Sequence, residues 1–129
     1  MAEEDLKYRS KLFDQETKPK ATTIGTESPF YRSVTGNRTA INLDIRKNTG
    51  DRRGFNYAYL TSPEFNKSQG ITLHFTDAKV IIEGRNLEPL YDRLLEHQVI
   101  YIAEAKHTDS FVNYPEHMLV VEKITISNA

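Results

Sequence analysis

The sequence predicts an α+β domain: a mostly antiparallel, curved sheet or partial barrel of about six strands, with one amphipathic helix at about residues 87–97. Several short runs alternate apolar and polar residues, which is the period of half-buried strands. One segment instead repeats apolar residues at intervals of three and four, which is the period of a helix. A single short helix cannot cover both faces of a flat sheet, so we expect the sheet to curl or to bury one face in a partner.

Length and composition fit one small domain. The chain has 129 residues, a net charge of −1 and no cysteine, which excludes disulfides and thiolate metal sites. Residues 1–30 are polar and include a breaker-rich segment over 18–23, so we expect a flexible or loosely docked N-terminal arm before a single domain over residues 31–129. No stretch approaches the roughly 20 apolar residues of a membrane span, and the acidic start lacks the apolar core of a secretory signal. We therefore expect a cytoplasmic protein with no membrane partner.

The first strands are predicted from residue 39 onwards. Residues 41–46 alternate apolar and polar side chains, and the following segment 48–51 contains a glycine that can adopt the positive φ of a tight turn. Residues 55–59 alternate again, with their aromatic side chains on one face, so these two runs are expected to pair antiparallel across the turn. Residues 62–66 contain a proline and are expected to break the pattern.

The remaining strands follow in the second half of the chain. Residues 71–75 and 79–83 alternate and are joined by short polar turns, which favours an antiparallel meander. Residues 99–102 form a further predicted strand after the helix, and residues 118–126 form the last one. The polar segment 105–117 between them is expected to be a loop.

The helix has the clearest local signal in the sequence. Asn86 is a suitable N-cap, and Pro89 would fall in the first turn, where its missing N–H costs little. The helix is expected to end near His97. Its apolar stripe consists of Leu87, Leu90, Tyr91, Leu94 and Leu95.

The strand and helix around residue 85 resemble a known segment. The stretch from Val80 to Tyr91 is similar to a V-x-I-x-G-R-N-L-x-x-L-Y segment of short bacterial proteins of unknown function. In those proteins an I-x-L-x-F strand precedes it, here residues 71–75, and a Y-x-Y-L segment comes before that strand, here residues 57–60. The resemblance covers roughly residues 40–104 and implies kinship, but it implies no reaction, ligand or cofactor.

Within this segment Arg85 is a candidate anion or partner contact. An arginine beside the unpaired N–H groups of a helix N-terminus can bind an anion. Glu83 and Glu88 flank the position with negative charge, however, and Pro89 removes one donor. The alternative is that Arg85 pairs with one of these two acids.

Charge is distributed unevenly along the chain. Residues 32–53 have a local charge of +4, whereas residues 83–129 have a local charge of −4. Such asymmetry can indicate a surface that binds a partner, or two faces that attract each other within the fold. The further candidate anion or partner contacts are Arg52, Arg53, Tyr57 and Tyr59.

Sequence motifs of catalysis are absent. The chain has no G-x-G-x-x-G, Walker or H-E-x-x-H pattern, and its four histidines have no standard metal spacing. The sequence therefore predicts no catalytic, cofactor-binding or metal-binding residue, although such a site can assemble from residues distant in sequence.

Three functions are compatible with these features. The first is a small non-catalytic binding or regulatory module that contacts a protein partner or a second copy of itself, because a sheet face is expected to be left uncovered. The second is a small β-barrel that binds single-stranded nucleic acid, because Phe55, Tyr57 and Tyr59 lie near a basic stretch in the sequence. The near-neutral pI of 6.4 argues against this second function. The third is a small-ligand-binding protein or enzyme with a pocket formed only in the fold.

Overall fold

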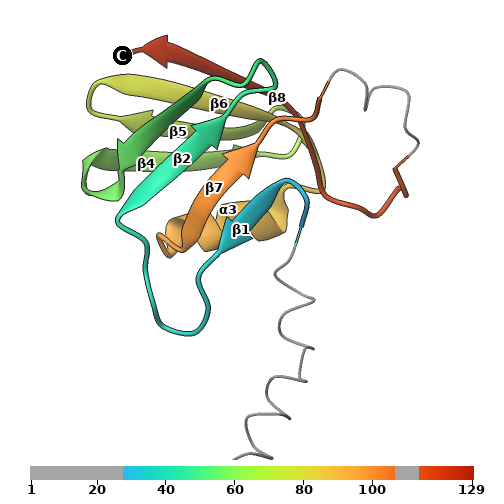
Figure 1. Cartoon of the computed structure of the whole chain (residues 1–129), viewed down its shortest axis with the longest axis horizontal. Coiled ribbons are helices and arrows are strands. Elements are labelled where there is room, and N and C mark those ends of the chain that lie inside the picture. Colours follow the sequence, from blue (N-terminus) through green and yellow to red (C-terminus); the bar gives the residue numbers. More distant parts are fainter. Residues whose placement is uncertain (1–27, 107–113) are drawn as a thin grey trace, which may run out of the picture.

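The computed structural model describes residues 28–106 and 114–129 and contains two four-stranded sheets and one α-helix, which confirms the α+β fold class (Figure 1). The first sheet, here called the β2 sheet, has the strand order β1-β7-β2-β3; the second, the β6 sheet, has the order β4-β5-β6-β8. In chain order the bounds are β1 Tyr31–Ser33, β2 Asn42–Arg46, β3 Arg52–Asn56, the 3₁₀ helix η1 Tyr57–Tyr59, β4 Leu60–Asn66, β5 Gly70–Phe75, β6 Ala78–Arg85, α3 Glu88–Leu95, β7 Val99–Ala103 and β8 Val120–Asn128. The sheets are curved and mostly antiparallel, and their eight strands exceed the predicted number of about six.

The β2 sheet contains the predicted hairpin and one pairing that was not predicted. Strands β2 and β3 pair antiparallel across a turn in which Gly50 has a φ of +100°. Strand β7 lies between β1 and β2 and runs parallel to β2, so residues 57 positions apart in the sequence, such as Asp44 and Tyr101, become neighbours. The expectation that regular structure begins near residue 39 is wrong, because β1 begins at Tyr31.

The expected N-terminal arm lies mostly outside the described residues, which begin at residue 28. Its last residue, Phe30, is 4% exposed and packs in the core. The Phe30 carbonyl also accepts a hydrogen bond from the Ala103 N–H at 2.7 Å. The predicted loop over 105–117 likewise falls partly outside the described residues.

The β6 sheet confirms the predicted antiparallel pairing of residues 71–75 with residues 79–83, which are β5 and β6; β4 and β8 add antiparallel on either side. The expected break over residues 62–66 is wrong, because these residues belong to β4. Pro63 is tolerated there because β4 is an edge strand, where a residue can lack an N–H without losing a ladder hydrogen bond.

The aromatic run after the hairpin is not a strand throughout. Strand β3 ends at Asn56, whose side-chain Oδ1 accepts the Ala58 N–H at 2.8 Å and starts the 3₁₀ helix. Phe55 and Tyr57 are buried, whereas Tyr59 is 56% exposed. The expected aromatic strand face is therefore absent from this segment.

Helix α3 is shorter than predicted and begins differently. Asn86 does not cap it: this residue has a φ of 54°, and its side-chain amide donates to the Glu116 and Met118 carbonyls at 2.9 and 2.8 Å. Leu87 occupies the N-cap position, and Pro89 lies in the first turn as expected. The helix ends at residue 95 rather than near 97. No helix in the described part of the chain is long and apolar enough to cross a membrane.

One apolar core lies between the two sheets and the helix. Rings from opposite sheets stack directly, with the Phe55 and Phe75 centroids 4.6 Å apart. The helix attaches to the edge of the β6 sheet, where the Tyr91 hydroxyl donates to the Pro63 carbonyl at 3.3 Å. Residues with no exposed surface include Leu43, Ile45, Ile71, Leu73, Ile82, Leu90, Leu94, Ile102 and Ile124.

Candidate interaction surface

The outer face of the β2 sheet gathers arginines from three strands. Arg32 of β1 pairs with Tyr101 of β7, which pairs with Asp44 of β2. Two residues further along β2, Arg46 pairs with Arg52 of β3. Residues that pair across neighbouring strands project from the same side of a sheet, so these side chains share one surface. We call this surface the arginine face; it consists of Arg32, Asp44, Arg46, Arg52 and Tyr101.

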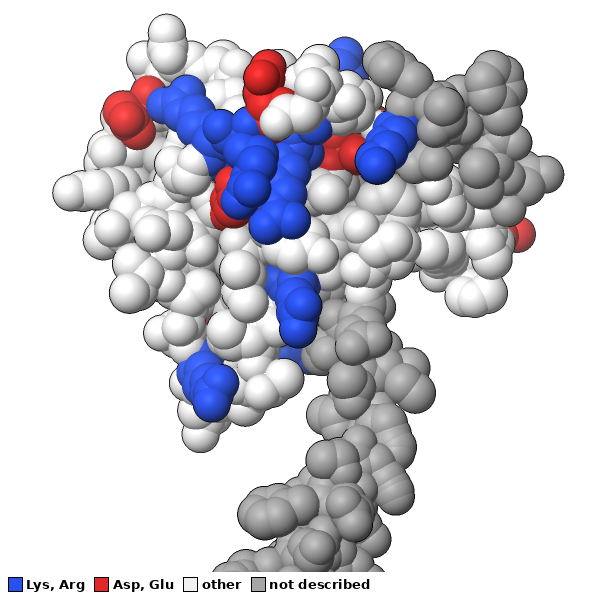
Figure 2. All heavy atoms as spheres, in the orientation of Figure 1, with Lys and Arg blue, Asp and Glu red and all other residues white. Residues whose placement is uncertain are grey.

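The arginine face is the side of the sheet that faces away from the core. Leu43 and Ile45 alternate with Asp44 and Arg46 along β2, and both apolar side chains are completely buried. Asp44 and Arg46 therefore point outward. Figure 2 shows Lys and Arg side chains gathered over the β2 sheet on this face, with acidic side chains beside them.

Asp44 orders two of the arginines. Its Oδ2 accepts hydrogen bonds from the Arg46 Nε at 2.9 Å and from the Arg52 Nη2 at 2.7 Å. Burial raises the pKa of Asp44, but the hydrogen bonds and charges of the two guanidinium groups outweigh burial and lower that pKa below its usual value. The face has three guanidinium groups and one carboxylate, which contacts two of them, so the face keeps an excess of positive charge.

Tyr101 lies at the centre of the arginine face. The Arg46 Cζ atom lies 3.8 Å from the Tyr101 ring centroid, which is a cation–π contact. On its other side Tyr101 lines a surface hollow together with Ser28, Pro29 and Arg32. The adjacent Ile100 is 37% exposed and adds apolar surface beside the arginines. The face therefore combines positive charge with an aromatic and an aliphatic side chain.

The predicted contact residues in this region separate into different environments. Arg52 belongs to the arginine face, and Arg53 is exposed with its guanidinium 4.8 Å from the Phe55 ring. Tyr59 is exposed but lies in η1, beyond the end of β3. The structure therefore brings only Arg52 onto the face defined by β2 and β7.

Tyr57 is not available as a surface contact. It is 3% exposed, and its hydroxyl donates to the Val99 carbonyl at 2.7 Å. Its ring stacks on His97 at 4.7 Å between centroids. Burial raises the pKa of Tyr57 well above its ordinary value, although the hydrogen bond to Val99 opposes this. Tyr57 is therefore a core residue with a satisfied hydroxyl.

Arg85 pairs with an acid that was not among the two expected. Its Nε lies 3.7 Å from the Glu122 Oε2 on β8, which neighbours β6. The hollow beside Arg85 is also lined by Lys67, Glu88 and Glu116, so cations and carboxylates balance there. This balance does not favour an anion.

Tyr101 and Arg32 were missed as site residues because the sequence does not show which strands become neighbours. Tyr101 is in a predicted strand, where it lies between Ile100 and Ile102, and the sequence alone does not show which way its side chain points. Its position beside Arg46 depends on the parallel pairing of β2 with β7.

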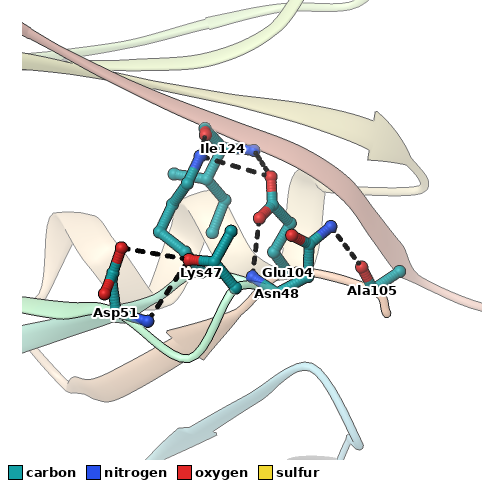
Figure 3. Close-up of polar contacts among 7 residues, drawn as sticks. Lys47, Asn48, Asp51, Glu104, Ala105 and Ile124 are labelled. Carbon is teal, nitrogen blue, oxygen red and sulfur yellow. Dashed lines mark hydrogen bonds and ion pairs between the residues drawn. The ribbon is translucent and has the colours of Figure 1, made fainter. Parts of the chain in front are cut away.

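A buried polar junction holds the basic hairpin against the other sheet (Figure 3). The Glu104 carboxylate accepts the Asn48 and Ile124 backbone N–H groups, both at 2.8 Å. The Lys47 Nζ lies 3.5 Å from the same carboxylate and also donates to the Ile124 carbonyl. The Asn48 side chain donates to the Ala105 carbonyl at 3.1 Å. These contacts join the hairpin, the segment after β7 and strand β8.

The junction determines the charge state of Glu104. Its side chain is only 5% exposed. Burial raises the pKa of Glu104, but the two backbone donors and the Lys47 ammonium together outweigh burial and lower that pKa below the usual range. Glu104 is therefore ionised, and its carboxylate oxygens are held by the Asn48 and Ile124 N–H groups and by the Lys47 ammonium.

Histidines and acidic side chains do not gather into a metal site in the described residues. No group of three or more His, Asp or Glu side chains there could hold a metal ion. His74 lies 3.5 Å from the Glu64 carboxylate, and His97 lies against Tyr57, whereas His107 is outside the described residues. No protein-family model, curated protein or solved structure matches the chain.

Proposed function

We propose that this chain is a small non-catalytic binding module that docks a protein partner on its arginine face. The observation that supports this most directly is the register of the β2 sheet, which places three arginines around Tyr101 on one exposed surface. Arginine and tyrosine are enriched at protein interfaces and among the residues that contribute most to binding. A cytoplasmic location is part of this proposal, and the cysteine-free composition is compatible with it.

The charge of the face identifies the chemistry of the partner. Arginine binds carboxylates through two parallel hydrogen bonds, and its planar group loses little freedom on binding when it is already ordered. Asp44 supplies that order for Arg46 and Arg52. A protein surface with several aspartates or glutamates is the matching partner.

A single-stranded nucleic acid is the second candidate, and one observation favours it: Tyr101 lies among arginines on a sheet surface. Base stacking requires free aromatic faces. Phe55 and Tyr57 are buried in the core, and the Arg46 guanidinium lies over the Tyr101 ring. The protein partner is therefore the better-supported proposal.

The test compares the purified full chain with a variant of the face. Native mass spectra at two ionic strengths give the oligomeric state first. Immobilised wild-type chain, the double variant Arg32→Glu/Tyr101→Ala and the control Lys79→Glu on the outer side of the β6 sheet are then exposed to nuclease-treated host lysate. Circular dichroism and thermal unfolding establish that each variant is folded.

The proposal predicts an acidic protein that wild type and Lys79→Glu retain, that salt releases, and that the double variant fails to retain. Salt sensitivity is expected because exposed ion pairs are screened at high ionic strength. Retention seen only in a parallel lysate without nuclease would replace the proposal with nucleic-acid binding. Equal retention by the double variant and by wild type would exclude the arginine face as the docking surface.

A further inference from the structure

Each sheet has two edge strands, and on three of these four edges a few contacts, a proline or a short irregular strand interrupt the backbone ladder. Strand β8 is covered by the polar junction: Ile124 donates its N–H to Glu104 and accepts from Lys47, and the Val121 carbonyl accepts the Ala105 N–H at 2.9 Å. An occupied or disrupted edge is how sheet proteins avoid unwanted strand pairing.

The edges at β4 and β1 are blocked in other ways. Strand β4 contains Pro63, which has no N–H, and the Tyr91 hydroxyl from α3 reaches its carbonyl. Strand β1 is only three residues long, and its register shifts between Arg32 and Ser33. Neither edge offers a regular ladder to an incoming strand.

Strand β3 remains open. The Lys47 N–H donates to the Asp51 carbonyl at 2.8 Å and the Tyr57 N–H donates to the Ile41 carbonyl at 3.0 Å. These bonds flank the β2–β3 ladder and show that odd-numbered β3 residues direct their backbone groups toward β2. The alternate residues, Arg52 and Gly54, direct theirs away, and no described residue forms a hydrogen bond with these backbone groups. Asn56 follows the same alternation, but it is the N-cap of η1, so its carbonyl accepts the first hydrogen bond of that helix.

We infer that β3 accepts an extended, acidic segment of a partner protein as a fifth strand of the β2 sheet. This inference rests on the proposed function and specifies how the partner binds. Backbone hydrogen bonds would supply affinity, and side chains at alternate positions would supply specificity, as in other cases of strand addition. The edge lies beside the arginine face, so one partner can contact both.

The side chains of β3 specify an acidic segment. Arg52 projects to the arginine face, whereas the next residue, Arg53, projects to the opposite side of the strand and has no carboxylate partner among the described residues. Two consecutive acidic residues on the added strand would therefore each face one guanidinium. At Gly54 nothing lies within 4 Å of where a Cβ would be, so the partner residue opposite it can be large.

The test titrates the ¹⁵N-labelled full chain with the capped peptide Thr-Val-Tyr-Glu-Glu-Thr and follows its amide resonances. A second peptide has lysine in place of both glutamates. A third is N-methylated at tyrosine and at the second glutamate, which removes the donors that would face β3 in the antiparallel register. Chain variants are Gly54→Pro, which removes an outward-facing donor, Gly54→Ala, which keeps it, and Lys67→Glu, an exposed charge change elsewhere.

Shifts at residues 52–56 are expected for wild type, with binding at least about tenfold weaker for the lysine peptide, the N-methylated peptide and Gly54→Pro. Lys67→Glu is expected to bind within about twofold of wild type, and Gly54→Ala, which keeps the N–H donor, is expected to bind more tightly than Gly54→Pro. Absence of shifts at millimolar peptide overturns the inference. Equal binding of the first and third peptides also overturns the inference. The proposed function nevertheless stands if the double variant Arg32→Glu/Tyr101→Ala fails to retain the protein that wild type retains from lysate. Should both experiments fail, the proposed function fails as well.

Discussion

Replacing Glu104 by alanine is the perturbation with the largest expected effect on stability outside the apolar core. The carboxylate connects the hairpin that carries the basic residues to strand β8 of the other sheet (Figure 3). Its removal leaves the Asn48 and Ile124 N–H groups without an acceptor and the Lys47 ammonium without a counter-charge. The buried position prevents water from replacing these contacts freely, because Glu104 is 8% exposed.

The magnitude follows from those three lost contacts. A buried donor left unsatisfied costs about 1–3 kcal/mol, and removing one member of a buried ion pair costs about 3–5 kcal/mol in total. We therefore expect Glu104→Ala to lower the free energy of unfolding by about 3–5 kcal/mol. Domains of this size are stable by only about 5–15 kcal/mol, so the variant would be close to unfolding. Glu104→Gln keeps one acceptor oxygen and is expected to lose less, about 1–3 kcal/mol.

Urea unfolding followed by circular dichroism measures these differences through linear extrapolation. The control is Glu64→Ala, which removes the same carboxylate from a side chain that is 63% exposed and 3.5 Å from His74. Exposed pairs contribute less than about 1 kcal/mol, so this control should unfold close to wild type. A Glu104→Ala midpoint equal to that of Glu64→Ala would refute the structural role of the junction.

Acid provides an independent measurement of the same group. Because the folded state lowers the pKa of Glu104, its contribution is complete above the unfolded value, about 4.3, and is lost as pH falls through the folded value. The stability difference between wild type and Glu104→Gln should therefore be constant near neutral pH and shrink below about pH 4. A difference that grows with acid would contradict the lowered pKa.

Four further substitutions test the fold. Gly84→Ala should prevent stable folding, because the new Cβ would lie 1.9 Å from a backbone oxygen of β8, whereas Gly54→Ala adds a methyl group in open space and should leave the urea midpoint unchanged. Tyr57→Phe should cost about 1–2 kcal/mol in urea unfolding, because it leaves a buried carbonyl of β7 without its donor. Asn86→Ala should lower the thermal midpoint, since it removes two hydrogen bonds to backbone carbonyls near residue 117 and places alanine at a φ of 54°; a midpoint equal to that of wild type would contradict both roles.

Most strands could be predicted because their signal is local. Residues 71–75 and 79–83 alternate as expected, and Gly50, with a positive φ, lies in the turn of the predicted β2–β3 hairpin. Period and turn chemistry are properties of neighbouring residues, so no knowledge of the tertiary fold is needed.

The errors arose where the tertiary environment outweighs local preference. Pro63 is acceptable in a strand only at a sheet edge, and the sequence does not show which strand is the edge. Asn86 is a good N-cap by type, yet here its amide bonds to a segment 30 and 32 residues away. Tyr57 continues an alternating pattern, but a single turn of 3₁₀ helix ends the strand before it.

The candidate surface could not be predicted for the same reason. Arg52 was identified from charge density alone, whereas Arg32 and Tyr101 become its neighbours only through the placement of β7 between β1 and β2. The parallel pairing of β2 with β7 also explains why the junction forms, because it aligns the chain so that Glu104 N–H donates to the Arg46 carbonyl at 2.9 Å. Glu104 then accepts hydrogen bonds both from Asn48 of the hairpin and from Ile124 of β8. One topological choice therefore assembles the arginine face, covers the β8 edge and leaves β3 as the open one.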